Sequence, residues 1–147
     1  MNEPKRVTIT YRVPYADTDQ MQVVYYANYL TLFERARNEL MRACGYTYRE
    51  LETGGFALPV LEAHVNYRAP ATYDDLLEIT AWCSEFKGVR LKICCEVRRD
   101  GKLLAEGYTV HAHVGFRSLR PMRPVPAFRA ALGFAVPDAR AHPRFID

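Results

Sequence analysis

Hydrophobic and polar residues follow two different periods in the first third of the chain. In residues 5–13 every second residue from Val7 to Val13 is hydrophobic and the residues between them are polar. This alternation predicts a strand. From residue 23 to about residue 44 the period becomes helical, and Gly45 follows at a position typical of a helix end. The predicted hydrophobic face of this helix comprises Tyr26, Tyr29, Leu30, Phe33, Leu40 and Met41.

The second half of the chain has the pattern of successive strands. We predict four of them, over residues 57–68, 75–86, 89–98 and 103–116. The third alternates most regularly, and Asp100-Gly101 after it is a strong hairpin-turn signal. In the last strand the pattern places Leu104, Tyr108 and Val110 on one face.

The element order is therefore β-α-β-β-β-β, which belongs to the α+β class. One long helix cannot cover both faces of a five-stranded sheet, so the simplest arrangement wraps the sheet around the helix. The remaining sheet face and edges need a partner, and we expect a homodimer or homotetramer. We expect one domain over residues 1–147, with its core in about residues 5–126, a short helix near 127–132 and a loose tail after about 136.

Composition narrows the function classes. The chain has 147 residues, 49% of them hydrophobic and 25% charged, as in an ordinary globular domain. A net charge of +3 gives no reason to expect nucleic acid as a partner, and no apolar stretch approaches the ~20 residues of a membrane span. The spacing of the four cysteines is not that of a disulfide framework, and Met1 is not followed by a signal-peptide pattern. We therefore expect a cytoplasmic protein.

Two carboxylates, Asp17 and Asp19, lie in the polar loop before the long helix. For Asp17 we favour a loop or capping role. Asp19 precedes an aromatic run that must pack, so partial burial would make its carboxylate a better base or nucleophile. The nearby helix start offers unpaired backbone N–H groups that suit a developing oxyanion. A carboxylate beside such donors fits acyl transfer to water, although capping is the commoner use of such a residue.

His111 and His113 are two residues apart in a predicted strand, a spacing that could hold a metal ion. No third ligand is evident, so we interpret them as structural and expect no metal and no cofactor.

Three motifs resemble the 4-hydroxybenzoyl-CoA thioesterase family, most closely its YbgC/FadM-like acyl-CoA thioesterase branch. They are the segment from Tyr15 to Tyr29, the segment Phe33-Glu-Arg-Ala-Arg37, and Val65-Asn-Tyr-Arg-Ala-Pro70 with the acidic segment after it. The resemblance covers about residues 5–126. It implies a hot-dog fold, an antiparallel five-stranded sheet wrapped around one long central helix, which dimerises edge to edge and often forms tetramers.

The resemblance also implies hydrolysis of an acyl-CoA thioester to CoA and a free carboxylic acid. Asp19 matches the reactive carboxylate and acts either as nucleophile or as general base. The backbone N–H of Tyr26 matches the group that polarises the thioester carbonyl. The chain departs from the family at two positions: Gln22 replaces a glycine that would permit a positive φ, and Tyr26 replaces a frequent histidine.

Further site residues are predicted around Asp19. Tyr15 is a candidate to orient Asp19 or border the pocket, and Gln22 and Asn28 are candidates for substrate contact, with a structural role favoured for Asn28. Basic residues at or near strand ends are candidates for the CoA phosphates; they are Arg68, Lys87 and Arg90.

Two alternatives stay open at this point. One is a hydratase or dehydratase of the same fold, although none of the four histidines lies near Asp19 in the sequence. The other is a non-catalytic protein that binds acyl-CoA or docks an acyl carrier protein, an alternative that the unusual Gln22 and Tyr26 keep open.

Overall fold

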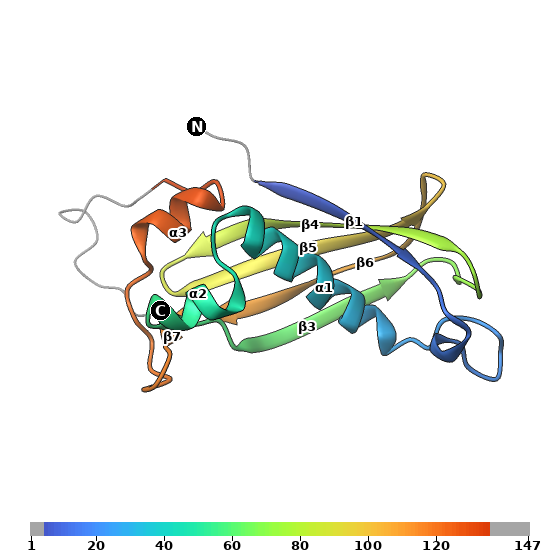
Figure 1. Ribbon diagram of the computed structural model, residues 1–147, viewed down its shortest axis with the longest axis horizontal. Helices are drawn as coiled ribbons and strands as arrows, with labels where there is room; N and C mark the ends of the chain where they lie inside the picture. Colours follow the sequence, from blue (N-terminus) through green and yellow to red (C-terminus); the bar gives the residue numbers. More distant parts are fainter. Residues whose placement is uncertain (1–4, 136–147) are drawn as a thin grey trace.

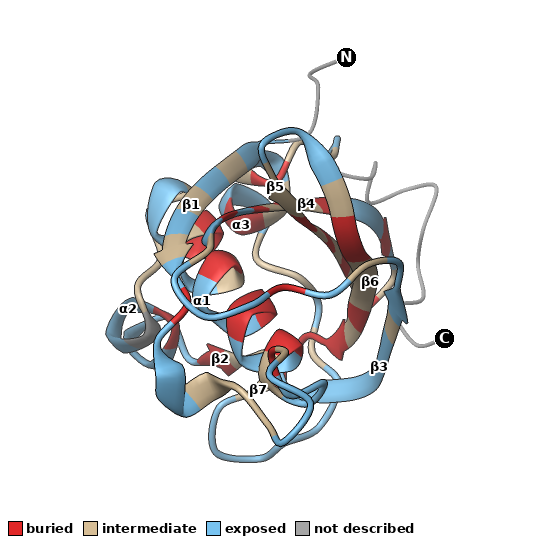
Figure 2. Ribbon diagram, turned by 90° about the vertical axis from the view of Figure 1, so that its right-hand side faces the viewer, coloured by how far each residue is buried: buried red, intermediate tan, exposed pale blue. Residues whose placement is uncertain are grey.

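A five-stranded antiparallel sheet wraps around one long helix in the computed structural model, which describes residues 5–135. The strands are β1 (Arg6–Arg12), β3 (Val60–Tyr67), β4 (Leu76–Lys87), β5 (Arg90–Arg99) and β6 (Lys102–Ala112). They lie in the order β1-β4-β5-β6-β3, and every neighbouring pair is antiparallel. The central helix is α1 (Asn28–Ala43), which the sheet surrounds on one side (Figures 1 and 2). The predicted α+β hot-dog architecture is confirmed.

The core lies between α1 and the concave face of the sheet. In β4 and β5 the buried and more exposed positions alternate, as expected for strands covered on one face. The buried residues of these strands and those of α1 belong to one core cluster. This core includes Phe33, Ala36, Leu40, Leu77, Ile79, Leu91, Ile93 and Val97.

Gly107 in β6 allows α1 to pack closely against the sheet. A Cβ atom at this position would collide with the carbonyl oxygen of His64 on β3 and press on the ring of Phe33 on α1. The absence of a side chain therefore sets the distance between the helix and the β3–β6 pair.

The helix begins later than predicted. Residues 23–27 form turns and isolated bridges, because Val24 donates its N–H to the carbonyl of Ala71 at 2.8 Å and Val23 pairs with Thr72. Their backbone groups are thus already bound outside a helix, and α1 starts at Asn28. Tyr26 consequently lies two residues before the helix rather than on its hydrophobic face.

The residues predicted to share one face of the last long strand differ in burial. Leu104 is buried and Tyr108 and Val110 are half-buried, whereas Thr109 and His111, at the alternate positions, are buried. The strand ends at Ala112, and the remaining residues of the predicted strand contribute the two-residue β7 (Val114–Gly115).

The end of the molecule opposite the Asp19 loop is closed by small elements. These are α2 (Tyr48–Thr53), β2 (Phe56–Ala57), which pairs with β7, and α3 (Pro126–Ala131). Phe128 and Leu132 are fully buried, so the predicted core boundary at about residue 126 was too early. The predicted tail after residue 136 lies outside the described residues. Among the residues that the structure describes, no helix combines the length and apolar character needed to cross a membrane.

Candidate active site

The loop between β1 and α1 lies at one end of the molecule (Figure 1). It contains a single 3-10 turn, η1 (Tyr15–Asp17), and then a tight turn at Asp19. The N–H of Gln22 donates to the carbonyl of Asp19 at 2.9 Å, and the N–H of Asp19 donates to the carbonyl of Val23 at 3.0 Å. To close this turn, Gln22 adopts a φ of 66°, the left-handed conformation that glycine usually occupies.

The Asp19 side chain is half-buried in this turn. Its Oδ1 atom accepts a hydrogen bond from the N–H of Met21 at 2.8 Å. Within residues 5–135 no donor reaches its Oδ2 atom, so one carboxylate oxygen orients the group and the other is available to a ligand or water.

Asp17 has a different environment. Its Oδ2 atom accepts a hydrogen bond from the Tyr11 hydroxyl at 2.5 Å, and its carbonyl accepts from the N–H of Tyr25 at 2.9 Å. The Asn28 side chain donates to the same carbonyl at 3.1 Å. Asp17 and Asn28 therefore hold the loop to β1 and to the start of α1.

The N–H of Tyr26 is the expected carbonyl-polarising donor, and it has no acceptor in the part of the chain that the structure describes. The carbonyl of Tyr25, on the other side of the same peptide bond, accepts the N–H of Asn28 at 2.9 Å. Because a peptide unit is planar and trans, this bond directs the Tyr26 N–H away from the helix. A free donor is thus presented at the end of the molecule that carries Asp19.

Two tyrosine rings pack against the side chain of Tyr26. Tyr26 packs against Tyr25, with ring centroids 4.8 Å apart, and edge-on against Tyr67 of β3 at 6.4 Å. The pKa of Tyr25 is raised by a hydrogen bond with the Tyr26 side chain and, to a smaller extent, by the nearby charge of Asp19. Tyr25 and Tyr67 were not predicted as site residues; the position of Tyr67 in the Val65-Asn-Tyr motif was the available signal.

The other predicted site residues divide between the two ends of the sheet. Tyr15 lies in the loop, where its ring packs edge-on against Tyr73. Arg68 directly follows β3 at the same end and forms an ion pair with Glu106 at 3.1 Å.

Lys87 and Arg90 lie at the opposite end, in the β4–β5 hairpin. The length of β4, roughly 36 Å at ~3.3 Å per residue, separates Lys87 from the end that carries Asp19. In one chain these two cations therefore do not belong to the Asp19 site, because strand ends in an antiparallel sheet alternate between its two sides.

The two buried histidines have structural environments. His111 shares a 2.8 Å hydrogen bond with Thr109 and a 2.9 Å hydrogen bond with the carbonyl of Leu58. His113 stacks on Phe56 with ring centroids 4.4 Å apart. Burial lowers the pKa of each imidazole to about 4, so both are neutral at pH 7. In the described part of the chain no three side chains gather as metal ligands.

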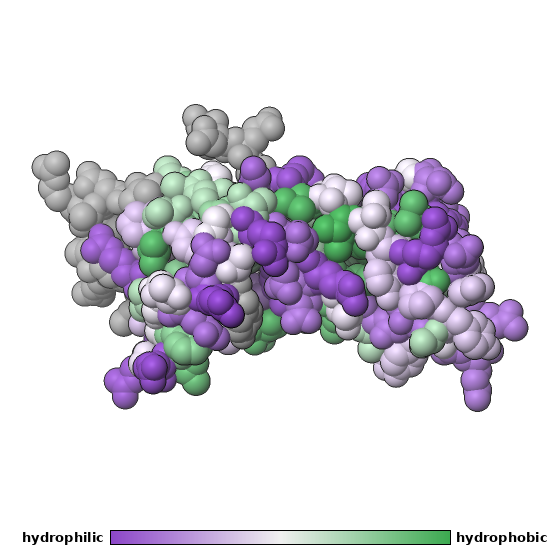
Figure 3. Space-filling view, in the orientation of Figure 1, coloured by the Kyte–Doolittle hydropathy of each residue, from purple (hydrophilic) through white to green (hydrophobic). Residues whose placement is uncertain are grey.

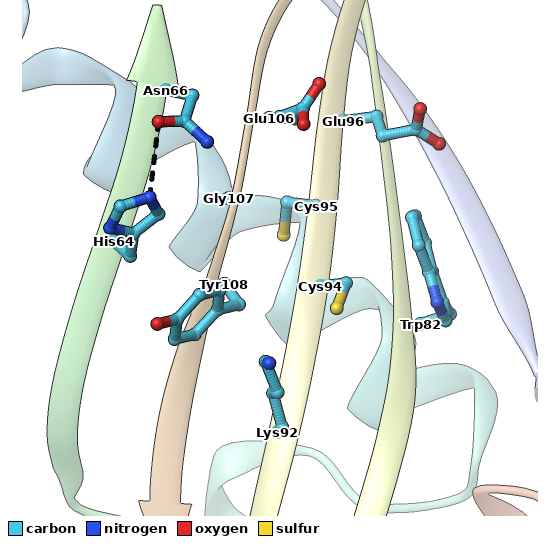
Figure 4. Close-up of a pocket in the computed structure, with 10 residues that line it drawn as sticks. All are labelled: His64, Asn66, Trp82, Lys92, Cys94, Cys95, Glu96, Glu106, Gly107 and Tyr108. Carbon is cyan, nitrogen blue, oxygen red and sulfur yellow. Dashed lines mark hydrogen bonds between the residues drawn. The ribbon is translucent and has the colours of Figure 1, made fainter.

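A shallow pocket of about 440 Å³ lies elsewhere, on the face of the sheet turned away from α1 (Figure 4). Its lining includes the charged residues Lys92, Glu96 and Glu106 and the ring of Tyr108. No residue of the Asp19 loop lines it. On the side that carries α1, hydrophobic and hydrophilic side chains are interspersed without one broad apolar area (Figure 3).

The amino-acid sequence of this chain is similar to known protein sequences. Residues 13–132 match the family model described as the thioesterase-like superfamily. The putative acyl-CoA thioesterase YneP of Bacillus subtilis is 30% identical over 117 residues, which cover 79% of this chain and 85% of that protein. The acyl-CoA thioesterase YbgC of Haemophilus influenzae is 35% identical over 112 residues, which cover 76% of this chain and 82% of that protein.

Solved structures share the fold. A hypothetical protein from Thermus thermophilus superposes with a TM-score of 0.79 at 33% identity, covering 85% of this chain and 95% of its own. The DHNA-CoA thioesterase of Staphylococcus aureus has a TM-score of 0.79 at 27% identity, with 86% of this chain and 87% of that one covered.

Proposed function

The chain belongs to the thioesterase-like superfamily, and from that premise we propose that it hydrolyses acyl-CoA thioesters to CoA and a free carboxylic acid, with Asp19 as the reactive carboxylate. One observation of the structure carries the assignment of the site. The free Oδ2 of Asp19 and the free N–H of Tyr26 lie at the same end of the molecule, in a segment held by hydrogen bonds on both sides.

The two groups have complementary roles in the proposed reaction. The Tyr26 N–H donates to the thioester carbonyl oxygen and stabilises the negative charge that develops there. As general base, Asp19 takes a proton from the attacking water; the C–S bond then breaks, and the proton passes to the CoA thiolate. As nucleophile, Asp19 itself attacks the carbonyl, releases CoA and forms an anhydride that water then hydrolyses.

We further propose that two copies of the chain pair along β3. This strand is an edge of the sheet, bonded to β6 alone, and seven of its eight residues are exposed. Val60, Leu61 and Tyr67 are each about half exposed on it. A long exposed edge strand with apolar side chains is a surface that natural proteins cover, and a second β3 offers the matching hydrogen-bonding groups.

Such pairing would bring Lys87 and Arg90 of one copy to the Asp19 end of the other copy. Two antiparallel β3 strands related by a two-fold axis bring opposite ends of the two copies together. We propose that Arg68 serves the CoA phosphates at its own chain's site, and that Lys87 and Arg90 serve those at the site of the second copy.

The cysteines support the proposed cytoplasmic location. All four are free thiols, and burial raises the pKa of Cys83 and of Cys95 to about 12. Unpaired cysteines fit a reducing compartment.

We further propose that residues 1–147 form one domain.

The decisive experiment measures CoA release, with a thiol reagent, from a panel of aromatic, short and long acyl-CoAs and one acyl carrier protein thioester. We expect the wild type to release CoA and Asp19→Asn to lower kcat at least 100-fold, because the amide is neither a base nor a nucleophile. The matched control is Asp17→Asn, which should keep kcat within a few-fold and mainly lower stability through its bond to Tyr11.

Each alternative gives a different result. A folded wild type that binds acyl-CoA without releasing CoA supports the non-catalytic protein, and consumption of an enoyl-CoA without CoA release supports the hydratase. Asp19→Asn that hydrolyses at the wild-type rate overturns the role of Asp19.

A further inference from the structure

We propose that Tyr67 is a positioning residue of the reaction: its hydroxyl group fixes the backbone of Tyr26 and thereby aims the N–H that polarises the thioester carbonyl. The inference rests on the proposed function of that N–H, and it adds a residue on a different element of the fold.

The geometry links β3 directly to the loop. Tyr67 is the last residue of β3, and its hydroxyl donates to the carbonyl of Tyr26 at 2.9 Å. Its ring packs edge-on against Tyr29 with centroids 5.3 Å apart. Tyr29 belongs to the first turn of α1 and is buried in the core, so the Tyr67 ring packs against a fixed side chain.

Residue 26 precedes α1 and lies between two peptide groups that are held separately. The peptide group that carries its N–H is held by the bond from Asn28 to the Tyr25 carbonyl, and Tyr67 binds the following one. The Tyr26 carbonyl otherwise accepts only the N–H of Tyr29, at a longer 3.3 Å, among the described residues. The bond from Tyr67 therefore restrains residue 26 on the side that the Asn28 bond does not reach, and the two bonds together fix its orientation.

Small shifts at this position matter for the chemistry. An oxyanion donor works when it lies about 2.7–3.1 Å from the charged oxygen, and misplacement by about 1 Å can cost up to ~100-fold in rate. Loss of the Tyr67 hydroxyl leaves the ring contacts in place, loosens the peptide group after residue 26 and lets the backbone of residue 26 shift. The expected loss is therefore in kcat, with substrate binding and folding largely retained.

The test is Tyr67→Phe, assayed with the best acyl-CoA of the wild type. We expect kcat to fall about tenfold, with KM within about twofold and the thermal midpoint within a few degrees. Replacement of Tyr67 by 4-aminophenylalanine restores an N–H donor at the ring's para position and should recover most of the lost kcat.

Tyr108→Phe is the matched control. The Tyr108 hydroxyl also donates to an oxygen, Oε2 of Glu62 at 2.7 Å, but it lines the pocket on the opposite face of the sheet. Its removal should leave kcat unchanged.

Three results overturn the inference: an unchanged kcat in Tyr67→Phe, an equal loss in Tyr108→Phe, or a kcat that 4-aminophenylalanine does not recover. In each case the wild type still hydrolyses acyl-CoA and Asp19→Asn does not, so the proposed function survives. An inactive wild type overturns both proposals.

Discussion

Gln22 is one of the two residues at which the chain departs from the pattern that it resembles, and its backbone has a conformation that glycine adopts readily. Its φ of 66° places a long side chain in the left-handed region, which costs an L-residue about 1–2 kcal/mol. The surrounding turn imposes this conformation, because Asp19 and Val23 hold it from both sides. Gln22 is exposed, so its side chain can avoid the core while its backbone remains strained.

Gln22→Gly should therefore stabilise the protein. We expect the free energy of unfolding to rise by about 1 kcal/mol, since glycine adopts this φ without a Cβ clash. Urea denaturation measures the change. Gln20→Gly, at an exposed position in the same loop without a positive φ, is the control and should lower stability by about 0.5 kcal/mol. A loss of stability in Gln22→Gly would contradict the explanation.

At the same scale, some site residues can be predicted from a local sequence motif, whereas others depend on contacts between residues far apart in the sequence. Asp19, Gln22, Tyr26 and Asn28 lie within ten residues of one another, so a local motif is enough to indicate that one segment carries them. The contact of Tyr67 with Tyr26 joins residues 41 positions apart and depends on where β3 ends beside α1.

At the scale of elements, hydrophobic alternation predicted β5 well and β6 poorly. Leu91, Ile93 and Cys95 are buried as their spacing requires. In β6 the buried positions include Thr109 and His111, which hydrogen-bond to each other and so satisfy their polar atoms inside the core. The hydrophobic pattern cannot detect such a pair, because threonine and histidine are polar and each, taken alone, is expected at an exposed position.

The buried histidines make stability depend on pH. The pKa of His113 is lowered by burial to about 4, against about 6.5 in an unfolded chain, so the unfolded chain binds the proton first as pH falls. The stabilisation is complete above about pH 6.5 and is lost progressively towards pH 4. From pH 7 to pH 5 the loss amounts to roughly 2 kcal/mol for one such group.

His113→Phe should flatten this dependence. The phenyl ring keeps the stacking on Phe56 and removes Nδ1, which has no hydrogen-bond partner among the described residues, and Nε2, which accepts from the N–H of Val125 at 3.4 Å. We expect the variant to lose about 2 kcal/mol less than the wild type between pH 7 and pH 5, as measured by urea denaturation at each pH. His64→Gln removes an exposed imidazole and serves as the control. Equal pH profiles for wild type and His113→Phe would refute the assignment.

At the scale of the whole molecule, the wrapped sheet has two edges with different surroundings. The β1 edge lies beside α1, and Tyr11 on it lies beneath the guanidinium of Arg35 from that helix at 5.2 Å. The β3 edge has few contacts with α1 and is exposed along nearly its whole length. The sequence predicted that an edge of the sheet would need a partner. It could not predict which strands form the edges, because the strand order depends on pairing between residues far apart in the sequence.

Ala63→Lys should test which edge is used. Ala63 lies in the middle of β3 and is exposed, so two paired β3 strands would bring two introduced ammonium groups close together across a two-fold axis. We expect sedimentation at micromolar concentration to show a wild-type dimer or tetramer and a dissociated Ala63→Lys variant. Activity should fall with dissociation, because Lys87 and Arg90 then no longer reach the second copy's site.

Thr10→Lys supplies the matched control, since Thr10 is exposed on the opposite edge strand, β1. It adds the same charge to the same sheet and should change neither the sedimentation nor the activity. Dissociation by both variants would indicate a general effect of charge, and dissociation by Thr10→Lys alone would move the interface to β1. A monomeric and active wild type would contradict the role of the second copy and leave Arg68 alone among the three predicted phosphate-binding residues at the Asp19 end.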